Sequence, residues 1–101
     1  MSVNIHLSLH IEKLASPDEA DRVESALREV IEEHGIESWV VIGVFHTDPP
    51  WVKVSSENGA IIVSGFAQWS TAFERDVETA VRAVAPAAHI DLEWDYPDER
   101  L

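Results

Sequence analysis

The chain contains no cysteine. This absence excludes disulfides, thiol nucleophiles and cysteine-ligated zinc or iron–sulfur sites, and it fits a reducing compartment. The first residues, Met-Ser-Val-Asn-Ile-His, lack the basic start and the apolar run of a secretion signal. No apolar stretch approaches the ~20 residues that span a bilayer. We therefore expect a cytoplasmic protein that is not inserted into a membrane.

Basic residues are also scarce. Seven lysines and arginines stand against 19 aspartates and glutamates, which gives a formal net charge of −12. DNA, RNA and anionic membranes are themselves negative, and proteins that bind them need lysine and arginine. We therefore expect no nucleic-acid or membrane partner. A basic protein, by contrast, would be steered toward this chain by its charge.

The length of 101 residues allows one hydrophobic core and no second one. Hydrophobic residues make up 46% of the chain, as in globular domains. The four glycines are scattered and form no phosphate-binding loop. We predict a single domain over residues 1–101, with a loose tail from about residue 96.

Periodicity in the first half of the chain predicts a strand, a helix and a second strand. Apolar residues alternate with polar ones over residues 3–11, so Val3, Ile5, Leu7, Leu9 and Ile11 should share a buried face. A helix should follow over residues 17–34, because Ser16, Pro17 and Glu19 make a capping box and Gly35 supplies a stop. Residues 37–46 predict a strand with Trp39, Val41, Gly43 and Phe45 on one face. Both faces of this strand are largely apolar, so we expect it to be covered on both sides or to sit beside a partner.

The second half predicts a hairpin, a helix and a last strand. The hairpin arms are residues 51–55 and 60–68, joined by a turn at Asn58-Gly59. The helix should begin after Trp69, with Ser70 as its cap or with Thr71 and Glu74 as a capping box, and should end before Pro86. Residues 88–95 alternate again, with Ile90, Leu92 and Trp94 facing inward. The order β-α-β-β-(β)-α-β predicts an α+β fold, a ferredoxin-like antiparallel sheet of four to five strands with two helices on one face.

Histidines are the candidates for a metal site or for acid–base chemistry. His6 and His10 point to the same side of the first strand but lie about 13 Å apart. If the last strand neighbours the first, Asp91 and Glu93 would lie across from them, and one interpretation of this set is a histidine–carboxylate metal site. The spacing matches no established ligand pattern, so cross-strand His–acid pairs are the preferred interpretation, and we predict no metal and no cofactor.

Two other histidines have structural or catalytic interpretations. His34 ends the first helix, where a cation complements the helix dipole. His46 beside Asp48 resembles an acid–base pair, but no nucleophile with a fixed motif accompanies it. We assign no catalytic residue.

Tryptophan combined with acidic residues marks a candidate binding surface. Trp51 follows two prolines, and Trp94 is followed by an acidic strand end. Aromatic side chains beside complementary charge dominate protein-binding hot spots. The predicted partner-binding residues are Asp48, Trp51, Asp91, Glu93, Asp95, Tyr96 and Asp98. The alternative places tryptophans in the core, and it is favoured for Trp39, Trp69 and Trp94.

In size, charge and element order the chain resembles the small acidic α+β immunity proteins of bacterial polymorphic-toxin systems. The most distinctive pieces of this resemblance are the junction Trp69-Ser70-Thr71-Ala72-Phe73-Glu74 and the strand end Trp94-Asp95. The resemblance implies no enzymatic activity and one cognate toxin, and it assigns no functional residue. The main hypothesis is therefore an acidic protein-binding module, of the inhibitor or immunity type, that neutralises a basic partner.

Two other functions stay open at this point. The chain is similar to dimeric α+β barrel proteins, the small monooxygenases and ligand binders that pair two ferredoxin-like sheets. Their pocket would be lined by His6, His10, His46 or Trp39. Alternatively, the protein is an assembly subunit whose sheet face or edge pairs with its own copy through Trp39, Val41 and Phe45. A homodimer is compatible with the binding module and with the barrel.

Overall fold

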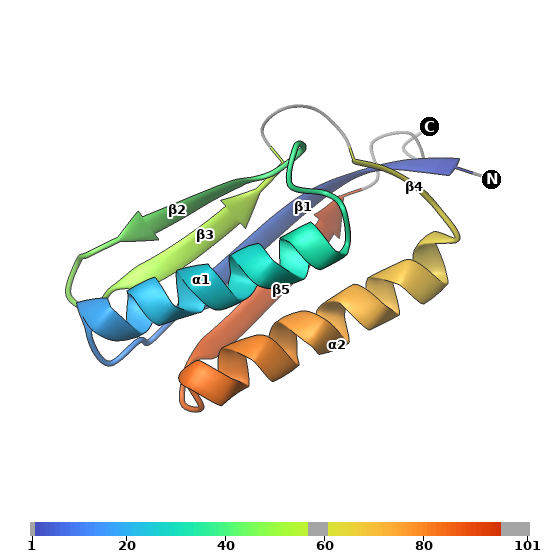
Figure 1. Ribbon diagram of the computed structural model, residues 1–101. Coiled ribbons are helices and arrows are strands. Elements are labelled where there is room, and N and C mark those ends of the chain that lie inside the picture. Colours follow the sequence, from blue (N-terminus) through green and yellow to red (C-terminus); the bar gives the residue numbers. More distant parts are fainter. Residues whose placement is uncertain (1, 57–60, 96–101) are drawn as a thin grey trace.

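A computed structural model describes residues 2–56 and 61–95. Five strands and two helices follow one another along the chain in the predicted order (Figure 1). Their bounds are β1 (Ser2–Glu12), α1 (Pro17–Glu33), β2 (Val41–Phe45), β3 (Trp51–Ser55), β4 (Ile61–Ser64), α2 (Phe66–Val84) and β5 (His89–Asp95). The predicted turn at Asn58-Gly59 and the tail from residue 96 lie outside the described residues.

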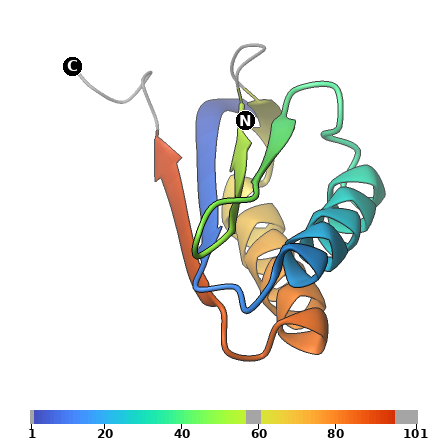
Figure 2. The same ribbon diagram turned by 90° about the vertical axis from the view of Figure 1, so that its left-hand side faces the viewer.

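The sheet is built around β1. Residues Ser8 to Ile11 of this strand pair with both β3 and β5, so these two strands lie on opposite sides of it. Strand β2 pairs with β3, and every pairing is antiparallel. The spatial order β5-β1-β3-β2, with both helices on one face (Figure 2), is the ferredoxin-like arrangement that the sequence predicts.

The predicted hairpin is wrong. Both β3 and β4 pair antiparallel with β1, so they run in the same direction and cannot be the two arms of a hairpin. Two residues lie between Ile5 and Ser8 on β1, whereas five lie between their partners Ser55 and Ile61. Strands β3 and β4 thus each follow a different part of the long central strand.

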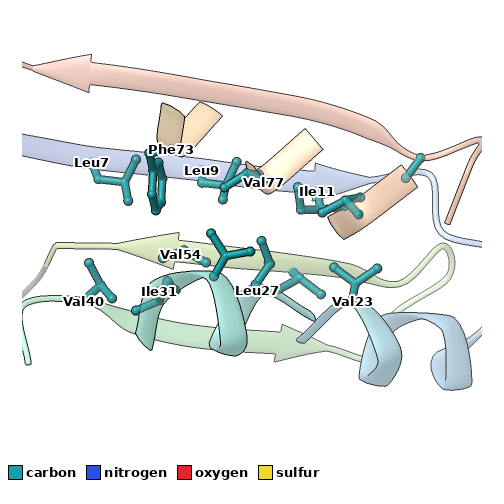
Figure 3. Close-up of a cluster of buried hydrophobic side chains, with 14 of the residues drawn as sticks. Leu7, Leu9, Ile11, Val23, Leu27, Ile31, Val40, Val54, Phe73 and Val77 are labelled. Carbon is teal, nitrogen blue, oxygen red and sulfur yellow. The ribbon is translucent and has the colours of Figure 1, made fainter. Parts of the chain in front are cut away.

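The core fills the space between the sheet and the two helices (Figure 3). Strand β1 contributes alternate residues, and Ile5, Leu9 and Ile11 are fully buried, as the alternation predicts. From α1 come Val23, Leu27 and Ile31, at helical spacing, and α2 adds Phe73, Val77 and Val81. Each helix thus covers the sheet with a single apolar stripe.

The two helices begin differently. For α1 the predicted cap is confirmed: the Ser16 hydroxyl accepts from the Glu19 backbone N–H at 3.1 Å, and Glu19 in return accepts from the Ala15 N–H at 2.9 Å. For α2 the prediction is wrong, because the helix begins at Phe66, after Gly65 in the left-handed conformation. The Ser70 and Thr71 hydroxyls donate to the Ala67 carbonyl about one turn earlier. Both residues therefore belong to the body of α2 and do not cap its start.

Strand β2 is shorter and less covered than predicted. The chain turns at residues 37–39, where the Trp39 N–H donates to the Ile36 carbonyl, and pairing begins only at Val41. Trp39 therefore packs against the core instead of sharing a face with Val41 and Phe45. Those two side chains are 43% and 40% exposed. Of the two expectations for this strand, cover on both faces is wrong, because both helices lie on the same side of the sheet. The alternative, that the strand sits beside a partner, stays a prediction.

Candidate protein-binding face

The side of the sheet turned away from the helices is called the open face here (Figure 2). Its residues follow from the register, since positions directly opposite each other point to the same side. Ser8 lies between Glu93 and Ser55, and His10 lies between Asp91 and Lys53. The open face therefore comprises His6, Ser8, His10 and Glu12 of β1, His89, Asp91, Glu93 and Asp95 of β5, Trp51, Lys53 and Ser55 of β3, and Val41, Gly43 and Phe45 of β2.

Strand β5 carries an acidic row along one side of the open face. Asp91, Glu93 and Asp95 alternate with the core-facing residues, so their carboxylates follow one another at about 7 Å. Asp91 and Glu93 are exposed, and Asp95 is half-buried. The predicted cross-strand arrangement is confirmed for Asp91, which lies opposite His10, whereas Glu93 lies opposite Ser8 and Asp95 opposite His6. Within residues 2–56 and 61–95, no group of three histidines or carboxylates is placed to hold a metal ion.

Three stacked rings extend across β2, β3 and β1, and this set is called the aromatic ladder. Phe45 and Trp51 are register partners on β2 and β3, with ring centroids 4.2 Å apart and planes 12° apart. Trp51 also stacks on His10 of β1 at 5.8 Å and 22°. The Phe45 ring lies over Gly43, where a Cβ atom would come within 3.2 Å of it. Glycine at this position thus lets the ladder lie flat on the sheet.

A hollow of about 510 Å³ opens beside the ladder. It is lined by His10, Glu12, Lys13, Pro49, Pro50 and Trp51. The loop between β2 and β3 forms one wall, with a cis peptide bond between Asp48 and Pro49 and the Thr47 hydroxyl donating to the Pro49 carbonyl at 2.8 Å. Apolar ring surface from the tryptophan and the prolines meets polar groups at the edge. A hollow of this volume and composition has room for one or more side chains of a partner.

His34 and His46 both have side-chain partners within the fold. The His34 Nε2 lies 2.9 Å from Asp76 Oδ2, and the His34 ring packs edge-on against Trp69 and Phe73, which ties the end of α1 to α2. His46 does not form the predicted pair with Asp48; its Nε2 lies 3.0 Å from Asp21 Oδ1 on α1. That contact is exposed on both sides, so it has the surroundings of a surface ion pair and not those of a catalytic dyad.

Four of the predicted partner-binding residues share the open face: Trp51, Asp91, Glu93 and Asp95. Asp48 lies in the exposed loop before Trp51, and Tyr96 and Asp98 fall outside the described residues. Trp39, Trp69 and Trp94 pack against the core, as the alternative interpretation predicts. Sequence reasoning missed Phe45 and His10 as ring partners of Trp51. The signal for Phe45 is the β2–β3 register, which alternation alone does not determine.

Comparison with known proteins supplies a fold and no function. No family model matches the chain, and no curated protein matches it. A solved structure, "De novo designed protein Foldit4", superposes with a TM-score of 0.60 at 9% sequence identity, covering 91% of this chain and 96% of that one. At this sequence identity the likeness shows the fold alone. In the described part of the chain, neither helix is long and apolar enough to cross a membrane.

Proposed function

We propose that this protein is a non-enzymatic binding module that recognises a basic protein through the open face. The observation that supports this most strongly is the co-location of two features on one uncovered surface. The acidic row of β5 and the aromatic ladder lie on the same side of one sheet and adjoin where His10, a ring of the ladder, lies opposite Asp91. Charge and aromatic anchors together are the composition of a protein-binding hot spot.

The two features would act at different stages of binding. The net charge of −12 attracts a basic protein from a distance and raises the association rate. After contact, the flat ring surface of Phe45 and Trp51 excludes water, and the hollow beside Trp51 receives a partner side chain. Because the rings and carboxylates stand on paired strands, little conformational entropy is lost on binding. An inhibitor that must bind a toxin tightly benefits from both stages.

The partner class follows from the charge and from the resemblance to immunity proteins. A basic enzyme, such as a toxin that acts on nucleic acid, presents lysines and arginines around its active site. The acidic row would pair with such residues in place of phosphate groups. We therefore propose inhibition of a basic toxin by occlusion of its active site, without any chemical step carried out by this chain.

The test is a capture experiment with charge-matched variants. Tagged protein is incubated with lysate of the source organism at about 50 mM and about 500 mM salt, a range over which exposed charge pairs become strongly screened. Wild type should capture one basic protein at low salt and much less at high salt. The variant Asp91→Asn/Glu93→Gln should lose most of that capture. The control Glu29→Gln/Glu32→Gln removes the same charge from exposed positions of α1 and should retain it.

The control separates the open face from net charge. Equal loss in both double variants would mean that overall charge, and not the acidic row, holds the partner, and the site proposed here would be wrong. Capture that does not respond to salt would contradict electrostatic recognition as a whole. For a partner captured as expected, inhibition of its activity by the purified protein tests the immunity function directly.

The dimeric barrel has less support from the geometry. Of its four candidate pocket residues, His6 and His10 lie on the open face, but Trp39 packs against the core and His46 contacts Asp21. Pairing two open faces would also bring acidic rows toward one another, which like charges oppose. A specific ligand found by thermal-shift screening, together with loss of binding on His6→Ala, would favour the barrel over the binding module.

A further inference from the structure

Strand β2 is an unprotected edge of the sheet. Among the described strands it pairs only with β3, and Figure 1 shows no element beyond it. Residues 39–45, Trp-Val-Val-Ile-Gly-Val-Phe, contain no charge and no proline. Natural edge strands usually carry lysine, proline or a bulge that prevents pairing with another chain. The two large hydrophobic residues that are exposed in the described part of the chain, Val41 and Phe45, both lie on this strand.

The opposite edge of the sheet, strand β5, is charged where the β2 edge is apolar. Strand β5 presents His89 and its acidic row, so two copies meeting there would place like charges together. The spatial order puts β1 and β3 between β5 and β2, which separates the acidic row from the β2 edge by about 14 Å. Because the whole chain carries a charge of −12, copies repel one another in general. That repulsion is weakest where the carboxylates are farthest away, at β2.

The sequence of β2 is also complementary to itself. When Val41–Phe45 is laid antiparallel against a second copy with Gly43 on the two-fold axis, Val41 faces the second copy's Phe45 and Ile42 faces its Val44. Each pair is then apolar, and the pair of Val41 with Phe45 is of the aromatic–β-branched type that stabilises sheets. The two-fold symmetry produces every pair twice.

We propose that two copies of this chain pair through β2 in this register and form one continuous sheet. This homodimer is formed by the edge of β2 and does not depend on the proposed function, although Phe45 also belongs to the aromatic ladder of the open face. It would set two open faces side by side on one sheet, so a partner with two basic sites would bind with avidity. A five-residue edge buries little surface, and we expect a weak dimer with a dissociation constant of about 10–100 μM.

Sedimentation equilibrium of the full chain tests the dimer. Samples from about 5 μM to about 1 mM span the expected transition, and each is run at about 50 mM and about 500 mM salt. The dimer should tighten as salt rises, because salt screens repulsion between two acidic copies. Capture of a basic protein should respond in the opposite direction, so failure of one proposal is distinguishable from failure of the other. A monomer at about 1 mM in high salt would overturn the dimer.

Two substitutions test the edge and the register. Val41→Lys and Phe45→Glu should each raise the dissociation constant about tenfold or more, since each removes two apolar cross-strand pairs. Thr79→Lys makes the same charge change as Val41→Lys on an exposed position of α2 and should leave dimerisation unchanged. Circular dichroism confirms that each variant is folded before it is compared.

Mixing the two folded variants examines the pairing itself. In the proposed register, position 41 of one copy faces position 45 of the other, so Val41→Lys and Phe45→Glu chains should form a heterodimer with one new opposite-charge pair. Recovery of dimer in the 1:1 mixture, with each variant monomeric alone, supports the register. If the mixture stays monomeric, or if Val41→Lys dimerises as well as wild type, the proposed register is wrong.

Discussion

The two faces of the central strand β1 differ strongly in burial and in composition. On the helix side of β1, Ile5, Leu9 and Ile11 are fully buried, whereas His6, Ser8 and His10 on the open face are only partly buried. Both sets alternate along the same stretch of backbone, so the difference arises from what covers them. Folding needs one apolar face, which the two helices complete. The composition of the other face is then free to serve binding, and it contains rings and carboxylates.

The largest difference in stability should be between substitutions at two neighbouring residues of β1, one on each face. Leu9→Ala removes a fully buried side chain at the centre of the core and should lower the free energy of unfolding by about 2–5 kcal/mol. His10→Ala, on the next residue but on the open face, should cost less than about 1 kcal/mol because it loses only its stacking on Trp51. Urea denaturation of both variants measures the difference. Equal losses would mean that the open face contributes to folding as much as the core does.

Trp51→Ala should have an intermediate effect. It removes the middle ring of the aromatic ladder and with it two stacking contacts, at a cost of about 1–2 kcal/mol in unfolding free energy. Lys53→Ala, on the same strand and face, is the control and should change stability by less than about 0.5 kcal/mol. Thermal unfolding compares the two. If Trp51→Ala leaves stability unchanged, the stacking would have no energetic weight, and the ladder could not act as a rigid anchor.

Local patterns predicted the elements whose partners lie close in sequence or whose exposure alternates. The β1 and β5 faces and the Ser16 cap follow from spacing alone, and the structure confirms them. The same reasoning failed at Thr71 and Glu74, which have the capping-box spacing but lie inside α2. A serine or threonine three residues before a glutamate also occurs on a helix surface, so the motif marks a helix start only where the backbone leaves the helix. The start of α2 is marked instead by Gly65, which has the left-handed backbone conformation.

Long-range pairing was the other source of error. Asn58-Gly59 predicted a hairpin between β3 and β4. Strand β1 is instead long enough to pair antiparallel with both, so β3 and β4 run in the same direction. The aromatic ladder is likewise a product of register: Trp51 was a predicted binding residue, yet its contacts with Phe45 and His10 join three strands. The acidic row required only alternation and was predicted in full. The candidate site was therefore predictable strand by strand and for the β1–β5 pair, but not across β1, β3 and β2.

The smallest expected effect is an increase in the free energy of unfolding. It tests whether the polar residues of the open face lower the stability of the fold while favouring binding. Ser8 lies at the middle of β1, between Glu93 and Ser55, where a β-branched apolar residue would fit the pleated surface better. Ser8→Val should raise the free energy of unfolding by about 0.5 kcal/mol, measured by urea denaturation. The same substitution should weaken capture of a basic partner, because it places an apolar side chain beside the acidic row. If Ser8→Val lowers stability, serine is already the better residue for folding here. The open face would then be shaped by the stability of the sheet, and its polar composition would no longer count as support for binding.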